Sequence, residues 1–298
     1  MSPPLIFDRA LIRRHLARAE AAGGVDFLIS HVAADLVDRL APVLRSFALA
    51  VDLGAATAHG ARALARSGRV ESVVRLAALP PKTRNGLPVA VADEEALPLA
   101  AESVDLVASL LALQGANDLP GALAQVRRAL RPDGLFMAAL LGGDTLSELR
   151  EAFAQAESEI EGGLSPRVAP FADLRELGSL LQRAGFALPV TDIDRLTVRY
   201  DSPLALMHDL RRMGATNALI ERRRRPLRRA TLERMADVYI ARFADPDCRI
   251  RATFEIVHLS GWAPHESQQQ PLAPGSARAR LADALGTREQ SAGEKAER

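Results

Sequence analysis

A short apolar run that ends in an acidic residue and a turn of small residues most constrains the fold of this chain. Residues 47–53 are apolar except for Asp52, and Gly54 follows them directly. A run of this length, followed by the helical spacing of residues 61–65, indicates a buried parallel strand that turns into a helix. In open α/β sheets the ligand binds at the carboxyl ends of the strands, beside such a turn. We therefore expect a nucleotide-type ligand near Asp52 and Gly54.

The alternation of strand and helix continues along most of the chain. Further apolar runs predict strands at residues 70–76, 87–91, 103–111, 135–141, 188–200 and 250–260. Strands that alternate with amphipathic helices call for a parallel, doubly wound sheet. Two helices, expected at residues 6–22 and 27–44, precede the first strand. They either cover the ligand cleft or only pack on the edge of the sheet, and the sequence leaves both interpretations open.

Polar residues follow the third predicted strand. Asp93 and Glu94 come directly after residues 87–91. Asp93 either accepts a hydrogen bond from an exocyclic amine such as that of adenine or caps the next turn. The second predicted strand ends near Ala77 instead, without the carboxylate that commonly holds ribose hydroxyls in nucleotide-binding units.

Composition and charge narrow the class of protein. The formal net charge of the 298 residues is +1, so no bulk field attracts nucleic acid or a membrane surface. Cys248 is the only cysteine, and the six histidines show no zinc-ligand spacing, so we expect neither an intrachain disulfide nor a metal site. The first residues lack the apolar core of a secretory signal, and no apolar run is long enough to cross a bilayer. We therefore expect a cytoplasmic protein with no transmembrane segment and no nucleic-acid partner.

Several segments together resemble a known family. Asp52-Leu53-Gly54 resembles the start of motif I, D-L-G-x-G-x-G, of the class I S-adenosylmethionine methyltransferases, with Ala56 and Ala58 at the next two glycine positions. The similarity continues through residues 104–107, 117–120 and 130–136, which resemble the family's fourth strand to fifth strand. Residues 142–150, 163–166, 170–171, 261–262 and 265–267 resemble one branch, the methyltransferase-like assembly factors of respiratory complex I, which are related to the methyltransferase of early biotin synthesis.

The resemblance implies a fold and a division of the chain. The implied fold is α/β: a Rossmann-like class I methyltransferase fold with a mostly parallel seven-stranded sheet, helices on both faces and a last strand antiparallel to its neighbours. Residues 1–46 would form N-terminal helices and residues 47–270 the methyltransferase-like domain, with a helical lid inserted at about 201–247. Residues 271–298 are rich in polar residues and proline, and we expect them to be disordered.

The resemblance also implies S-adenosylmethionine as the cofactor. Its implied contacts are Asp52, Gly54, Ala56, Asp93, Glu94 and Gln114. The same pocket departs from the family pattern at the motif I alanines, at Ala77 and at Gln114 and Gly115, where the family often has histidine and tryptophan. An alanine adds a methyl group where the ligand approaches the backbone and disfavours positive φ. We therefore predict weak or absent binding of S-adenosylmethionine.

Three functions remain open. The leading one is a methyltransferase-family protein that acts on a protein partner, and the resemblance implies a complex I subunit as that partner. The alternatives are a cofactor-less assembly factor and a protein arginine hydroxylase, the latter on family analogy alone. No catalytic residue is assigned, because methyl transfer from a sulfonium depends mainly on positioning. The arginine-rich residues 222–229 are either solvated surface, which we favour, or a docking site for an acidic partner.

Overall fold

The computed structural model describes residues 5–54, 56–80, 86–171, 173–269, 276 and 281–288. The chain divides into two compact units, Met1–Pro264 and His265–Arg298. The second unit includes one short described helix, α9 (Leu281–Leu285). The disorder expected for residues 271–298 falls mostly outside the described residues, so everything below concerns the first unit.

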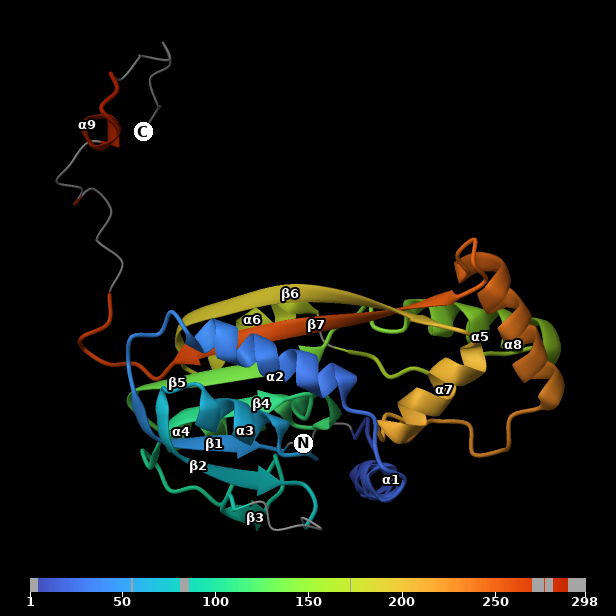
Figure 1. Ribbon diagram of the computed structural model, residues 1–298, viewed down its shortest axis with the longest axis horizontal. Coiled ribbons are helices and arrows are strands. Elements are labelled where there is room, and N and C mark those ends of the chain that lie inside the picture. Colours follow the sequence, from blue (N-terminus) through green and yellow to red (C-terminus); the bar gives the residue numbers. More distant parts are fainter. Residues whose placement is uncertain are drawn as a thin grey trace. The chain divides into compact units, whose positions relative to one another are not determined.

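Seven strands form one twisted sheet (Figure 1). Their bounds are β1 (Phe47–Leu53), β2 (Val70–Ala77), β3 (Val89–Val91), β4 (Val104–Leu110), β5 (Leu130–Leu141), β6 (Ala187–Tyr200) and β7 (Ile250–Trp262). The order is β3-β2-β1-β4-β5-β7-β6, with β1 to β5 parallel and β7 antiparallel to both of its neighbours. The expected mostly parallel, seven-stranded fold is confirmed.

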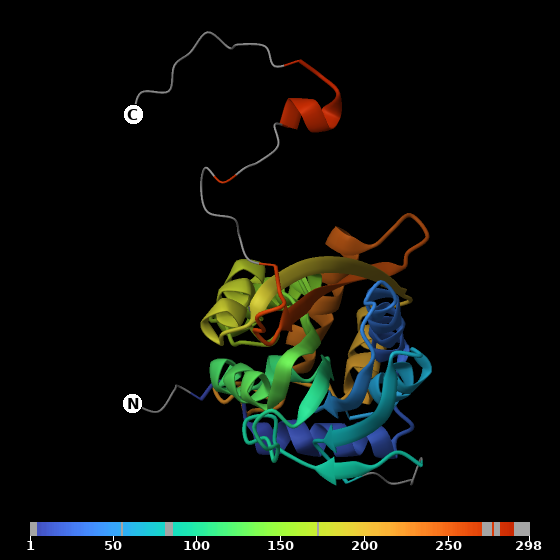
Figure 2. The same ribbon diagram turned by 90° about the vertical axis from the view of Figure 1, so that its left-hand side faces the viewer.

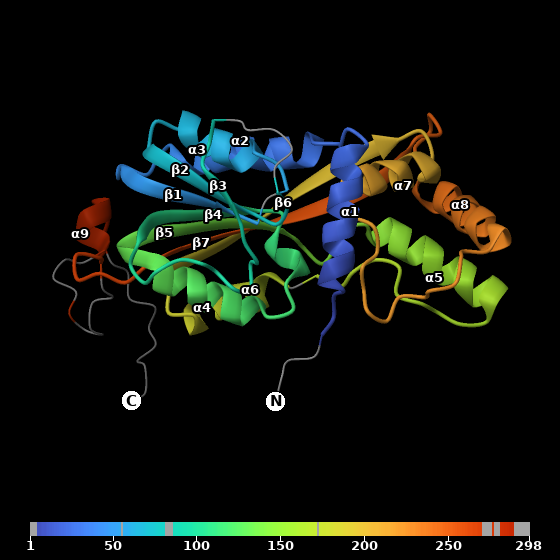
Figure 3. The same cartoon turned by 90° about the horizontal axis from the view of Figure 1, so that it is seen from below.

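Helices cover both faces of this sheet (Figure 2, Figure 3). Their bounds are α1 (Arg9–Ala21), α2 (Phe27–Leu40), α3 (His59–Arg66), α4 (Leu119–Ala129), α5 (Ser147–Glu161), α6 (Leu174–Arg183), α7 (Pro203–Arg212) and α8 (Arg229–Phe243). In Figure 3, α2 and α3 lie on one face, and α4 and α6 on the other. All seven residues of β4 are buried as a result, which accounts for its nearly continuous apolar sequence.

The remaining helices lie beyond the carboxyl edge of the parallel strands. α5 packs on α8, and α7 lies beside them near the far ends of β6 and β7 (Figure 1). The expected lid segment, residues 201–247, thus consists of α7, α8 and the loop that joins them. In the part of the chain that the structure describes, no helix combines the length and the apolar character needed to cross a membrane.

The structure differs from the sequence-based element bounds in two informative places. Residues 131–134, whose Arg-Pro-Asp-Gly sequence is typical of a turn, form an irregularity inside β5, where Asp133 has φ 62° and its amide donates to the Ala263 carbonyl at 3.0 Å. The helix expected to reach residue 44 ends at Leu40, two residues before Pro42, which cannot continue it. The sequence shows both breakers, but not that residues 131–134 are part of the sheet.

Candidate functional site

A large cavity opens at the carboxyl ends of the parallel strands, where the sequence places the ligand. Its volume is about 640 Å³. Gly54, Ala78, Glu94 and Ala112, which follow β1, β2, β3 and β4 respectively, line one end. The opposite end is apolar and is lined by side chains that include Phe153, Met207, Leu210, Leu232 and Phe254. The cavity therefore joins a polar end at the sheet to an apolar end under α5, α7 and α8.

Gly54 forms the tight turn at the polar end. Its φ is +77°, a conformation that L side chains rarely adopt. A Cβ at this position would lie 2.8 Å from both Ala112 Cβ and Glu94 Cγ. The Gly54 amide donates to the Leu76 carbonyl at 2.7 Å, which ties the turn to β2. Only glycine fits this turn, as motif I requires.

Asp52 lies behind this turn and not among the residues that line the cavity. Its side chain is buried, and its Oδ2 accepts a hydrogen bond from the Ala61 amide at 3.1 Å. Arg75 Nε lies 3.6 Å from the same oxygen, and a Cβ on Gly60 would lie 2.6 Å from Oδ1. Burial raises the pKa of Asp52 to about 6, although Arg75 opposes the shift. Asp52 thus holds the first turn of α3 in place, and its contact with a ligand stays a prediction.

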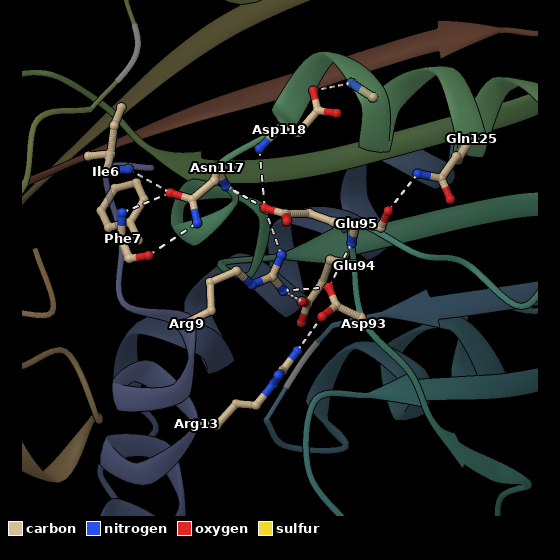
Figure 4. A network of polar contacts seen from close by, with 11 residues as sticks. Ile6, Phe7, Arg9, Arg13, Asp93, Glu94, Glu95, Asn117, Asp118 and Gln125 are labelled. Carbon is tan, nitrogen blue, oxygen red and sulfur yellow. Dashed lines mark hydrogen bonds and ion pairs between the residues drawn. The ribbon is translucent and has the colours of Figure 1, made fainter. Parts of the chain in front are cut away.

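Three consecutive carboxylates, which we call the acidic triplet (Asp93, Glu94 and Glu95), surround one guanidinium at the polar end (Figure 4). Arg9, from α1, is 2.8 Å from Asp93 Oδ1 and 2.7 Å from Glu95 Oε1, and it also pairs with Glu94. Arg13, one turn later, pairs with Asp93. The Arg9 side chain is only 16% exposed. Helix α1 therefore closes the polar end of the cavity through an arginine.

The charges in the triplet reflect both burial and this arginine. Burial raises the pKa of Glu94, and Arg9 opposes that shift. Burial also acts to raise the pKa of Asp93, but the Glu95 amide and the nearby Arg13 and Arg9 side chains hold it below its usual value. The surroundings of Asp93 thus favour its charged form, whereas burial disfavours the charge of the more deeply buried Glu94.

A second layer of hydrogen bonds fixes the triplet (Figure 4). Glu95 accepts hydrogen bonds from the amides of Asn117 and Asp118, and the Gln125 side chain donates to the Glu95 carbonyl at 2.7 Å. Asn117 Oδ1 in turn accepts from the Ile6 and Phe7 amides, both at 2.8 Å. The segment that leads into α1 is therefore bound to the loop before α4.

Gln114, Ala56 and Ala78 complete the side of the cavity near the sheet. Gln114 Nε2 donates to the Leu111 carbonyl at 2.8 Å, while its buried Oε1 has no hydrogen-bond partner among the described residues. Ala78, rather than the buried Ala77, lines the cavity at the end of β2. Ala78 therefore lies at the cavity, one residue beyond the position that the resemblance implied for the ribose carboxylate.

The residues present fit S-adenosylmethionine only in part. The Gly54 turn and the unpaired Gln114 oxygen provide backbone space and an acceptor. However, Ala78 supplies no carboxylate for ribose hydroxyls, and Glu94 is bound to Arg9. The pocket therefore has the shape expected for the cofactor but lacks part of its polar contacts.

The sequence-based site missed Arg9, Arg13 and the apolar end of the cavity. Arg9 and Arg13 were visible as two arginines four residues apart on a predicted helix, which places them on one face. Nothing in their spacing indicates the triplet as a partner, because these contacts join residues 80 and 85 positions apart in sequence.

Comparison with known proteins agrees with the geometry. Residues 51–138 match the family described as "Methyltransferase domain". A zebrafish (Danio rerio) protein named "Arginine-hydroxylase NDUFAF5, mitochondrial" is 38% identical over 290 residues, which cover 93% of this chain and 89% of that protein. A "Malonyl-[acyl-carrier protein] O-methyltransferase" of Halorhodospira halophila is 36% identical over 281 residues, or 91% of this chain and 93% of that protein. The YcgJ protein of Bacillus subtilis has the same fold, with a TM-score of 0.52 at 17% identity over 79% of this chain and 99% of its own.

The expected cytoplasmic location is wrong. The zebrafish, mouse and human NDUFAF5 relatives are all named as mitochondrial proteins. The expectation depended on the lack of a secretory signal and of a membrane-spanning run. Neither feature distinguishes a cytoplasmic protein from a mitochondrial one, since mitochondrial targeting segments are amphipathic and not continuously apolar.

Proposed function

Because the chain belongs to the class I methyltransferase family, in the branch of the NDUFAF5 proteins, we propose that it hydroxylates an arginine side chain of a protein partner. The observation that carries the proposal is the acidic triplet, whose carboxylates surround the Arg9 guanidinium at the cavity. Carboxylates pair with guanidinium groups through strong, directional hydrogen bonds. A substrate arginine that displaces Arg9 would find the same partners.

The residues of this chain would position the substrate. Glu94 and Asp93 would hold the guanidinium, and the apolar walls of the cavity would exclude water from the reacting carbon. Hydroxylation places one oxygen atom of O₂ in a C–H bond and reduces the other to water, which takes two electrons from an external reductant and two protons. The incomplete set of contacts for S-adenosylmethionine supports a reaction other than methyl transfer.

The partner and the location are parts of the same proposal. The resemblance to the complex I assembly factors makes a subunit of respiratory complex I the proposed partner. The names of the NDUFAF5 relatives make the location a mitochondrial one. The exposed Arg224 and Arg225 are available to an acidic partner, whereas Arg222 and Arg223 pair with Asp8 and Glu161 within the fold.

Methyl transfer is the second candidate. It is supported by the identity with the O-methyltransferase of Halorhodospira halophila and by the preserved Gly54 turn. A scaffold function without chemistry is the third, and it is supported by the altered cofactor positions Ala56 and Ala78. Hydroxylation and methyl transfer predict different covalent products on the partner, and the scaffold function predicts none.

Mass spectrometry of complex I subunits tests these functions. The subunits would be compared between cells that express the chain, cells that lack it, and cells that express Glu94→Gln. We expect an arginine that carries one extra oxygen atom only when the chain is present, with at least about a tenfold smaller modified fraction for Glu94→Gln because the guanidinium loses its position.

Glu151→Gln serves as the matched control, since Glu151 is a half-exposed carboxylate that pairs with Arg242 on the surface. This variant should hydroxylate normally. An added methyl group in place of oxygen would establish methyl transfer, and assembly that needs the chain without any covalent change would establish the scaffold function.

A further inference from the structure

A second group of ligand-type side chains lies where α2 passes over β6 and β7. His31 and Asp35 are one helical turn apart on α2, Asp194 lies on β6 and His258 on β7. None of the four lines the large cavity, although Leu28, one turn before His31, does. The antiparallel register pairs Asp194 with Ile256, so Asp194 and His258 are two positions apart along the same ladder. The fold thus brings together residues separated by more than 200 positions.

The contacts within this group pair each imidazole with a carboxylate. His31 Nε2 is 2.9 Å from Asp194 Oδ2, and His258 Nε2 is 3.2 Å from Asp35 Oδ2. One ligand atom each from His31, Asp35 and Asp194 lies within 4.8 Å of the other two. Ligands bound to one first-row metal ion at about 2.1 Å lie roughly 3.0–3.4 Å from one another. Both pairs already have spacings close to this range.

His258 provides an independent indication of a ligand. Its side chain is 7% exposed, and its Nε2 has no hydrogen-bond partner among the described residues despite the nearby Asp35 carboxylate. A buried polar atom without a hydrogen bond is unfavourable, because folding removes it from water. From this position the imidazole lies behind the Asp35 carboxylate and can orient it toward an ion shared with His31 and Asp194.

The alternative explanation is that the group consists of two ordinary histidine–aspartate ion pairs, and it explains the arrangement less well. His59 and Asp26 form such a pair, with Nε2 3.2 Å from Oδ2. Within the part of the chain that the structure describes, however, only the His31 group brings three metal-ligand atoms together. The neighbouring positive charge of Arg39 is balanced by Asp192, which it approaches at 2.7 Å.

We propose that His31, Asp35 and Asp194 bind a first-row divalent transition metal ion, with the buried His258 beside Asp35. The imidazole nitrogen favours ions such as Zn²⁺, Co²⁺ and Fe²⁺ over Mg²⁺ and Ca²⁺, which prefer all-oxygen ligand sets. His31 and Asp194 are each 37% exposed, so the ion has access from solvent and an open side. The binding itself rests on the ligand geometry alone.

Titration of the EDTA-stripped full chain with Co²⁺ tests the proposal, with visible absorbance as the readout. We expect one equivalent of Co²⁺ to produce saturable d–d bands, and added Zn²⁺ to remove them. Metal should also raise the melting temperature, because it binds only the folded chain. His31→Gln and Asp194→Asn, both at half-exposed positions, should weaken binding at least about tenfold.

His258→Ala should weaken Co²⁺ binding less than His31→Gln does, because it removes a neighbour of Asp35 and not a ligand; the melting curve confirms that the variant folds. His59→Ala is the matched control and should bind Co²⁺ as the unmodified chain does. The absence of saturable bands in the unmodified chain would overturn the proposal. So would full binding by the folded His31→Gln and Asp194→Asn variants, or an equal loss in His59→Ala. None of these outcomes depends on whether the chain hydroxylates arginine.

Discussion

At the scale of single residues, the acidic position of motif I supports the turn and not the ligand. Asp52 lies opposite Arg75 in the β1–β2 register and caps the start of α3 through the Ala61 amide. Gly60 leaves room for its Oδ1. The carboxylate therefore contributes to the site by holding the Gly54 turn in place, at the cost of burying a titratable group.

This burial predicts a specific dependence of stability on pH. The pKa of Asp52 is about 6 in the folded chain against a reference value of 3.8, so the folded state binds more protons between these values. The stabilisation is therefore present below about pH 4 and is lost as the pH rises through 6. Relative to the unmodified chain, Asp52→Asn should gain about 1 kcal/mol of unfolding free energy between pH 5 and 7.5.

Urea unfolding of both proteins at several pH values measures this difference in unfolding free energy. The contributions of titratable groups that the two proteins share cancel in the difference. Asp237→Asn, which changes an exposed carboxylate on α8, should show no such trend. A constant difference for Asp52→Asn across the range would contradict a raised pKa.

The cofactor positions lead to a second prediction at this scale. Ala56→Gly with Ala78→Asp restores a small residue and a carboxylate at two positions that line the cavity. A charge-assisted hydrogen bond contributes about 1.5–3 kcal/mol, so binding of S-adenosylmethionine should tighten roughly tenfold or more. Calorimetric titration measures both proteins, with Ala56→Gly alone as the control for the added carboxylate. Micromolar binding by the unmodified chain would show that its pocket is not impaired.

At the scale of elements, periodicity located α1 but not its contacts. Residues 6–22 read as a helix because of their apolar spacing, and Asp8 caps it by accepting from the Leu11 amide at 2.9 Å. The sequence left open whether this helix covers the cleft. Its arginines bind the acidic triplet across the chain, and long-range ion pairs leave no local pattern from which they could be predicted.

Arg9→Ala should therefore loosen α1. The change removes the shared partner of three neighbouring carboxylates, whose mutual repulsion then favours opening of the helix. We expect amide hydrogen exchange within Arg9–Ala21 to accelerate at least about tenfold, with little change in the β4 amides. Arg18→Ala, an exposed position on the same helix, should leave the exchange unchanged. Equal protection of α1 in the two variants would show that Arg9 does not hold it.

At the scale of the whole molecule, the sequence predicted the layers better than the sites. Buried parallel strands are continuous apolar runs, so β1 and β4 were recognisable from the pattern of apolar residues alone. The antiparallel direction of β7, in contrast, followed only from the family resemblance, and its place between β5 and β6 was not predicted. The cluster of His31 with His258 could not be predicted at all, because it depends on the register of β6 against β7 and on how α2 crosses them.

The division of the chain leads to the last prediction. Every residue of the two apolar core clusters lies between Leu28 and Ala263. Ala263 is itself needed, because its amide donates to the Gly134 carbonyl at 2.7 Å and closes the end of β7 against β5. A chain that ends at Gln269 keeps all of these contacts. It should therefore unfold in one cooperative transition, with a melting temperature within about 2 °C of that of the full chain.

The matched control is a chain that ends at Ser260. It lacks Trp262, whose backbone pairs with both Leu135 and Ala187 and so connects β7 to its two neighbours. This shorter chain should melt well below the full chain or lose its cooperative transition, since two strand pairs are cut at once. Differential scanning calorimetry of the full chain and of the chains that end at Gln269 and Ser260 measures these transitions. Loss of the transition already at Gln269 would mean that residues beyond it contribute to the folded core.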